Sequence, residues 1–214
     1  MLKEFGEPSW NYQVIRFFDE KKREVIPRKD RVWTVEALAK RMTEALAAAD
    51  RPVPLYLKAL AGVAAANEPA QAAFATHCFW TGEFRLGGLA GVLMTEAGWF
   101  DGREVTRVTW DRSVLAFDQL LTQATKFDCA DKVFVGSEDD RKAASSGRFS
   151  VRTLDESYRR AKLSDQKRQI SGTPFERLNL SPVQATKINA LARTNPESAL
   201  NWLTPLQRSS LINS

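Results

Sequence analysis

Proline follows a helix-capping residue at four places near the C-terminus of this 214-residue chain. The four pairs are Thr173-Pro174, Ser181-Pro182, Asn195-Pro196 and Thr204-Pro205. Proline suits the first position of a helix, because the N–H group that it lacks would have no partner within the helix. The short distances between the pairs leave room only for short helices. The sequence therefore predicts an array of short helices over residues 173–212.

One longer helix is predicted just before this array, over residues 153–168. Thr153 is followed three residues later by Glu156, which is the pattern of a capping box. On or next to this helix we expect a partner-binding surface of six basic residues: Arg152, Arg159, Arg160, Lys162, Lys167 and Arg168. Such a stripe suits the phosphates of a nucleic acid or an acidic protein surface. A solvated helix face without a partner is the alternative.

Charge is divided unevenly along the chain. Residues 141–214 hold 13 Lys and Arg against 5 Asp and Glu, whereas residues 1–140 hold 18 against 21. The polar tract 136–147 lies near this change and is typical of a mobile loop or a boundary. We therefore expect an α+β body over residues 1–147 and a basic helical region over residues 148–214. A single domain that contains both is the alternative.

Hydrophobic periodicity places both helices and strands in the body. Aromatic and β-branched residues predict strands over 10–18, 24–26, 104–110 and 132–135. Helical spacing of apolar residues predicts helices over 34–49, 55–66, 69–79 and from about 111 or 113 to 125. The predicted fold class is therefore α+β and helix-rich, with a small central sheet and a C-terminal array of short helices.

The chain has two cysteines, Cys78 and Cys129, and one histidine, His77. These residues cannot supply the four ligands of a structural zinc site. His77 and Cys78 fall in a predicted helix, where neighbouring side chains point about 100° apart and cannot face each other. We therefore expect two buried thiols and a core or boundary histidine, and we predict no catalytic residue and no metal. An enzyme that uses Cys78 or Cys129 with His77 is kept as a further hypothesis.

Six of the eleven glycines fall between Gly82 and Gly102. The run contains no Gly-Lys-Ser or Gly-Lys-Thr, and its spacing does not match the dinucleotide-binding fingerprint. Tight turns and close packing are the expected roles, and no cofactor is predicted. Residues 181–203 have the dimensions of a helix–turn–helix. Their second helix carries Glu197 and Ser198 rather than Arg or Lys, which disfavours sequence-specific reading of DNA.

Two further observations concern location. No stretch reaches 18 apolar residues, so no membrane span is predicted. The first residues contain no apolar segment of the kind found in a secretion signal. Together with the few cysteines, these features predict a cytoplasmic protein.

Three stretches resemble plasmid fertility-inhibition factors: Trp10–Phe18, Val32–Leu38 and the helical array from Ser181 to Gln207. Proteins of this family are made by one conjugative plasmid and block the transfer of another, typically by acting on the coupling ATPase of the secretion channel. Some members carry a Gly-Arg-His-Arg signature. The nearest match here, Asp101-Gly102-Arg103-Glu104, lacks the histidine, so nuclease or ATPase activity is not carried over.

The resemblance implies a cytoplasmic, non-enzymatic inhibitor of conjugative transfer whose partner is the coupling ATPase of a rival plasmid. A nucleic-acid-binding regulator that uses the basic C-terminal helices is the alternative function.

Overall fold

The computed structural model describes residues 3–10, 13–145 and 149–212. The chain forms two compact units, Met1–Ala65 and Ala66–Ser214. This division differs from the predicted one, because residues 148–214 contribute two strands to the sheet of the second unit. Among the described helices, none is both long enough and apolar enough to cross a membrane.

The first unit combines a hairpin with two helices. Strands β1 (Ile15–Phe18) and β2 (Glu24–Lys29) pair antiparallel, and η1 (Lys3–Phe5) precedes them. Helices α1 (Val35–Ala48) and α2 (Leu55–Ala61) and the short η2 (Gly62–Ala65) follow. Thr34 caps α1 as predicted, accepting a hydrogen bond from the Ala37 N–H. Residues 11–12 of the strand predicted over 10–18 lie outside the described residues.

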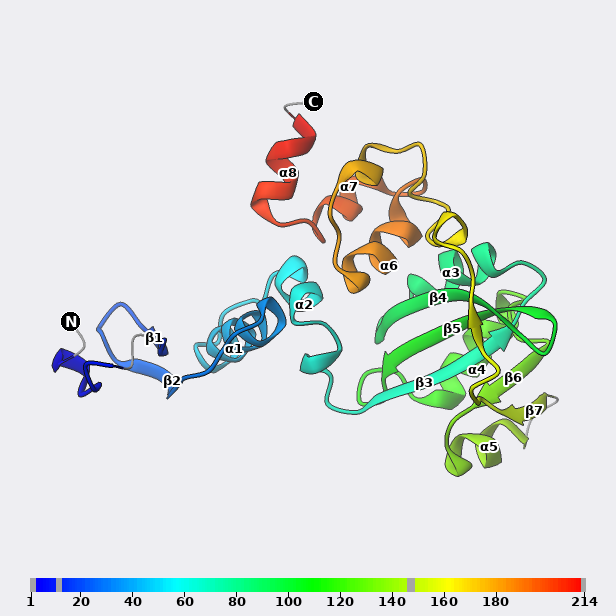
Figure 1. Ribbon diagram of the computed structural model, residues 1–214, viewed down its shortest axis with the longest axis horizontal. Helices are drawn as coiled ribbons and strands as arrows, with labels where there is room; N and C mark the ends of the chain where they lie inside the picture. Colours follow the sequence, from blue (N-terminus) through cyan, green and yellow to red (C-terminus); the bar gives the residue numbers. More distant parts are fainter. Residues whose placement is uncertain (1–2, 11–12, 146–148, 213–214) are drawn as a thin grey trace. The chain divides into compact units, whose positions relative to one another are not determined.

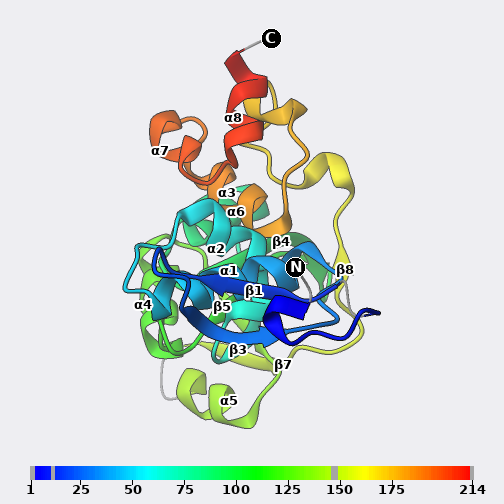
Figure 2. The same ribbon diagram turned by 90° about the vertical axis from the view of Figure 1, so that its left-hand side faces the viewer.

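The second unit is built on a mixed six-stranded sheet in the order β7-β6-β3-β5-β4-β8 (Figure 1; β8 is labelled in Figure 2). The strands are β3 (Pro69–Ala75), β4 (Val92–Phe100), β5 (Arg103–Asp111), β6 (Lys132–Val135), β7 (Ser150–Thr153) and β8 (Arg159–Arg160). Among the described strands of this sheet, β6 and β7 alone pair parallel. The predicted fold class, α+β and helix-rich with a C-terminal helical array, is confirmed.

Helices occupy both the middle and the end of this unit. They are α3 (Phe79–Gly87), α4 (Phe117–Lys126), α5 (Glu138–Ser145), η3 (Leu163–Asp165), η4 (Pro174–Arg177), α6 (Pro182–Leu191), α7 (Pro196–Leu200) and α8 (Pro205–Ile212). Figure 2 shows α6, α7 and α8 together at one end of the unit. Each begins at a predicted proline. The predicted capping box is present, because Ser181 Oγ accepts from the Gln184 N–H and Gln184 Oε1 accepts from the Ser181 N–H.

The helix predicted over residues 69–79 is wrong, since residues 69–75 form the central strand β3. Ala72, Ala73, Phe74 and Ala75 are all buried, because β3 lies between β5 and β6 and both of its faces are covered. A strand buried on both faces shows no alternation of polar and apolar residues. Alanine also favours helices by intrinsic propensity. Pairing with two neighbouring strands overrides that preference.

The helix predicted over residues 153–168 is also wrong. Thr153 is the last residue of β7, and the Leu154 N–H donates to the Val135 carbonyl at 2.9 Å instead of starting a helix. The chain then crosses the sheet to its other edge and pairs as β8 with β4. The tract predicted as a mobile loop over 136–147 contains α5, whose Ala144 is buried, although residues 146–147 lie outside the described part.

The two faces of the sheet are covered differently. One face packs against α3 and α4 around Leu86, Trp110 and Leu120. The other face carries Phe100 and Val105, which are covered at one end by Leu154 and Tyr158 of the crossing segment. Each face therefore positions its own set of polar side chains.

Candidate active site

Cys78 lies at the junction between the central strand β3 and helix α3. It is the N-cap residue of α3, and its carbonyl accepts hydrogen bonds from the N–H groups of Thr81 at 3.1 Å and Gly82 at 3.2 Å. Its side chain makes no capping hydrogen bond. The backbone of Cys78 therefore caps the helix, and its thiol takes no part in the capping.

Close packing of α3 on β5 fixes the position of this junction. A Cβ atom at Gly82 would lie 2.0 Å from Thr106 Oγ1, so the helix approaches the strand more closely than any other residue would allow. The Thr106 hydroxyl donates to the Phe79 carbonyl at 3.2 Å. These two contacts clamp the first turn of α3, which begins directly after Cys78.

Glu104 of β5 brings a carboxylate to the same place. Its Oε2 accepts a hydrogen bond from the Phe79 N–H at 2.9 Å, and its main-chain carbonyl accepts from the Thr76 N–H at 3.1 Å. Phe79 is the residue after Cys78, so the carboxylate is bound beside the thiol-bearing residue. The N-terminal end of a helix stabilises anions, and both a carboxylate and a thiolate benefit from it.

Aromatic rings surround the start of α3. The rings of Phe79 and Trp99 meet edge to face with centroids 5.7 Å apart, and those of Phe79 and Trp80 are 5.8 Å apart. The Trp80 indole donates to the Asp165 carbonyl at 2.9 Å, which fixes its orientation. Trp99 is 38% exposed and presents an apolar surface to which a small alkyl group can bind.

The two cysteines differ in accessibility. Cys129 is fully buried, and burial is the main cause that raises the pKa of its thiol to about 11. Cys78 is partly exposed. The prediction of two buried thiols is thus confirmed for Cys129 and wrong for Cys78. His77 is exposed as well, contrary to the core or boundary position predicted for it. Both residues precede α3 instead of lying within a helix, so the geometric argument against their use does not apply.

Three of the six predicted partner-binding residues are held by carboxylates. Arg152 pairs with Asp101, Arg160 pairs with Glu96 at 3.1 Å, and Lys167 pairs with the buried Glu83. These partners lie far away in the sequence, so the pairs cannot be foreseen from it. Lys167, whose partner is fully buried, is therefore part of the fold, whereas the side chains of Arg152 and Arg160 are more than half exposed.

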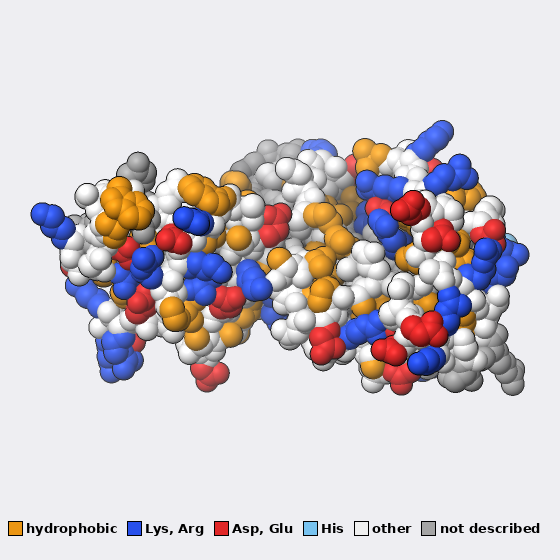
Figure 3. Space-filling view, turned by 60° about the horizontal axis from the view of Figure 1, so that its bottom comes forward, with side chains coloured by type: hydrophobic (Ala, Val, Ile, Leu, Met, Phe, Trp, Pro, Cys, Tyr) orange, Lys and Arg blue, Asp and Glu red, His pale blue; other side chains and the backbone are white. Residues whose placement is uncertain are grey.

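The other three predicted residues are exposed but do not form one stripe. Arg168 packs its guanidinium over the Trp80 ring at 5.3 Å, while Arg159 is on β8 and Lys162 follows it. On the face shown in Figure 3, basic and acidic side chains are mixed within each unit. A single basic surface at these positions is absent from the described residues, and their binding of a partner stays a prediction.

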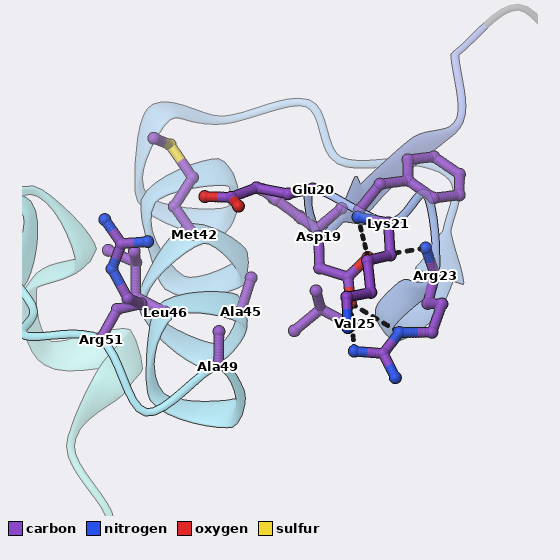
Figure 4. Close-up of a pocket in the computed structure, with 12 residues that line it drawn as sticks. Asp19, Glu20, Lys21, Arg23, Val25, Met42, Ala45, Leu46, Ala49 and Arg51 are labelled. Carbon is purple, nitrogen blue, oxygen red and sulfur yellow. Dashed lines mark hydrogen bonds and ion pairs between the residues drawn. The ribbon is translucent and has the colours of Figure 1, made fainter.

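The first unit contains a hollow of about 500 Å³ between its hairpin and α1 (Figure 4). Val25, Met42 and Leu46 form apolar walls, and Asp19 lies on the hairpin side. The Asp19 carboxylate accepts from the N–H groups of Lys21 at 2.9 Å and Arg23 at 2.8 Å, and the Arg23 hydrogen bond is the largest cause that lowers its pKa. That carboxylate stabilises the turn, so the hollow lacks an evident reacting group among its described lining residues.

No group of three or more His, Cys, Asp and Glu residues suited to a metal ion occurs among the described residues. The site at Cys78 is thus built from a thiol, a carboxylate and aromatic rings. It is the arrangement in the described chain that best combines an accessible nucleophile with an acid–base group.

Comparison with known proteins gives little support for any family. No family model matches the chain, and no curated protein is similar to it. A solved structure, the methionine sulfoxide reductase A of Corynebacterium diphtheriae, matches with 13% sequence identity and a TM-score of 0.40. The match covers 50% of this chain and 76% of that one. Such a distant likeness assigns neither fold nor activity.

The predicted inhibition of conjugative transfer through the coupling ATPase is corrected, because residues 153–168 do not form the basic helix on which the predicted contact depended. The resemblance to fertility-inhibition factors itself stays a prediction.

Proposed function

We propose that the second unit is a cysteine-dependent enzyme in which Cys78 is the nucleophile and Glu104 transfers the proton. The observation that carries this proposal is the position of the partly exposed Cys78 directly before α3, with the Glu104 carboxylate bound to the next N–H group.

An alkyl sulfoxide is the substrate class that suits these groups. The Glu104 carboxylate takes the proton of the Cys78 thiol, and the thiolate attacks the sulfoxide sulfur, forming a sulfur–sulfur bond, while Glu104 passes that proton to the sulfoxide oxygen. The protonated oxygen then moves to the Cys78 sulfur as the sulfur–sulfur bond and the bond between the substrate sulfur and oxygen break, so that a thioether leaves and Cys78 becomes a sulfenic acid. Two equivalents of an external thiol return Cys78 to the thiol and release water and a disulfide. The rings of Phe79 and Trp99 hold the alkyl group.

Methionine sulfoxide is the alkyl sulfoxide that oxidation of proteins produces, and its methyl group is small enough to pack against these rings. A cytoplasmic location belongs to the same proposal. A nucleophilic cysteine has to stay reduced, and thiols are kept reduced in that compartment.

The proposal is tested first by the reactivity of the thiols. The folded wild type and the variants Cys78→Ser and Cys129→Ser are treated with iodoacetamide, and the alkylated residues are found by mass spectrometry. We expect rapid alkylation of Cys78 in the wild type and in Cys129→Ser, and none of this rapid reaction in Cys78→Ser. Alkylation of folded Cys78 that is as slow as that of Cys129 would overturn its assignment as the nucleophile.

Turnover is tested separately with free methionine sulfoxide and dithiothreitol. We expect methionine to form with the wild type and with Cys129→Ser, but not with Cys78→Ser. Glu104→Gln should lower kcat at least tenfold with less effect on KM, because the carboxyl group acts in the transition state. A wild type that reacts rapidly with iodoacetamide but forms no methionine would remove the sulfoxide assignment and leave the nucleophile in place.

A further inference from the structure

A second cavity lies on the sheet face opposite the Cys78 site. Its volume is about 410 Å³. Glu104 and Arg107 of β5 are three residues apart, so their side chains leave the sheet on opposite faces. Gln71, Met94 and Thr109 form part of the floor, and Leu163 and Leu180 are among the residues that complete the lining.

The floor of this cavity contains a fixed cluster of charged groups around Glu96. Arg107 Nη2 donates to Glu96 Oε1 at 2.6 Å, and Arg160 Nε lies 3.1 Å from Glu96 Oε2. The Tyr158 hydroxyl also donates to Glu96 Oε1, at 2.7 Å. The Arg107 guanidinium stacks 4.3 Å from the centre of the Tyr158 ring. The two arginines are therefore held in place before any ligand binds.

Glycine at position 98 makes this arrangement possible. A Cβ atom there would lie 2.5 Å from the Tyr158 ring, so only glycine lets the ring lie directly on strand β4. The Tyr158 ring in turn packs against the Arg107 guanidinium. Preorganised groups of this kind favour binding, because little conformational freedom is lost when the ligand arrives.

The charges that line the cavity do not cancel. Glu96 is a single carboxylate shared between Arg107 and Arg160, and the third cation, Lys167, is already paired with Glu83. One positive charge is thus left over in a hollow where the Arg107 side chain is only 32% exposed. A hollow with excess charge of one sign attracts a ligand of the other sign.

We propose that this cavity binds a small organic anion. Its carboxylate accepts hydrogen bonds from Arg107 and Arg160, since a guanidinium group has five N–H donors and Glu96 occupies only some of them. Its apolar part lies against Met94, Leu163 and Leu180. The volume is within the range of small-molecule sites, and the apolar walls favour an organic anion over inorganic phosphate.

The test uses the full chain labelled with ¹³C at the methionine methyl groups. Met94 lines the cavity, whereas Met42 lines the hollow of the first unit and serves as an internal control. Benzoate is the anionic probe and benzamide is its neutral counterpart. We expect benzoate to shift the Met94 signal in a saturable manner, benzamide to leave it unchanged at the same concentrations, and Met42 to stay unmoved.

Two matched variants on the short strand β8 complete the experiment. Arg160→Gln should weaken benzoate binding at least tenfold, because it removes one of the two guanidinium groups. Arg159→Gln removes the same charge from the neighbouring exposed position and should leave the affinity unchanged. An unsaturable Met94 shift, equal shifts with benzamide, or equal weakening by the two variants would overturn the proposal. Because the site is on the opposite face from Cys78, none of these outcomes bears on the proposed enzyme.

Discussion

Replacement of Lys167 by methionine separates a structural role for this residue from the partner-binding role predicted for it. Glu83 is fully buried, and its Oε2 accepts from the Lys167 N–H at 2.7 Å. The Lys167 ammonium group donates to Glu83 Oε1 and, at 2.6 Å, to the Thr95 carbonyl. Lys167 is therefore the counter-charge of a carboxylate that water does not reach.

The expected loss of stability in Lys167→Met is large for a residue that the sequence places on a surface. Removing one partner of a buried ion pair costs roughly 3–5 kcal/mol, because the other charge stays buried without compensation. The double variant Glu83→Gln/Lys167→Met contains neither charge. It should regain at least about 2 kcal/mol relative to the sum of the two single variants, since residues in direct contact are not additive. Arg159→Met, which removes an exposed cation, should change stability by less than about 0.5 kcal/mol.

Urea unfolding of the full chain, followed through the Met94 methyl signal, measures the stability of the second unit directly. A loss below about 1 kcal/mol for Lys167→Met would refute the reasoning. The reasoning would also be refuted by a double variant whose loss of stability equals the sum of the losses in the two single variants, because the two side chains would then not interact.

Two further predictions concern other buried groups. Burial lowers the pKa of Lys187 from 10.5 to about 8, although its ammonium group donates to the carbonyls of Gly87 and Leu89. Between these two pKa values the unfolded chain therefore binds more protons than the folded one. The stability of the wild type relative to Lys187→Met should rise by up to about 3 kcal/mol from pH 8 to 10.5. Urea unfolding of both proteins at the two pH values measures this difference, and a difference that stays constant or falls contradicts the prediction. Gly82→Ala places a Cβ atom 2.0 Å from Thr106 Oγ1 and should cost about 1–3 kcal/mol in thermal unfolding. Adding Thr106→Ala should recover part of that loss, and no recovery would argue against this contact.

Local signals account for the parts of the fold that the sequence predicts well. Thr34 and Ser181 cap their helices with hydrogen bonds to residues three positions later, so a short window contains all the information. The C-terminal array follows from such caps and from proline, whose effect depends on its own backbone only.

Long-range pairing accounts for the parts that fail. The alanines of β3 become a strand because β5 and β6 pair with them on both sides, and Thr153 ends β7 because its neighbour Leu154 bonds to Val135. The basic residues lose their common face for the same reason. Three of the basic residues pair with Glu83, Glu96 and Asp101. Each of these carboxylates is 51 to 84 positions away from its partner along the chain.

The site at Cys78 follows the same division. Its residue types are visible in the sequence, but the interpretation of Cys78 depends on where α3 begins. A helix that starts at Phe79 leaves Cys78 at its N-terminal end, whereas a helix that continues through residues 69–79 buries it on one side. Glu104 is 25 residues from Phe79, and only the pairing of β3 with β5 brings it to the thiol.

A single-turnover reaction tests most directly whether Cys78 is the nucleophile. The fully reduced protein, freed of reductant, is mixed with methionine sulfoxide and then with dimedone, which reacts with sulfenic acids. The account predicts that methionine forms in proportion to the protein and that the dimedone adduct is found on Cys78. Methionine formed by Cys78→Ser in the same amount, or an adduct on Cys129 alone, would contradict it.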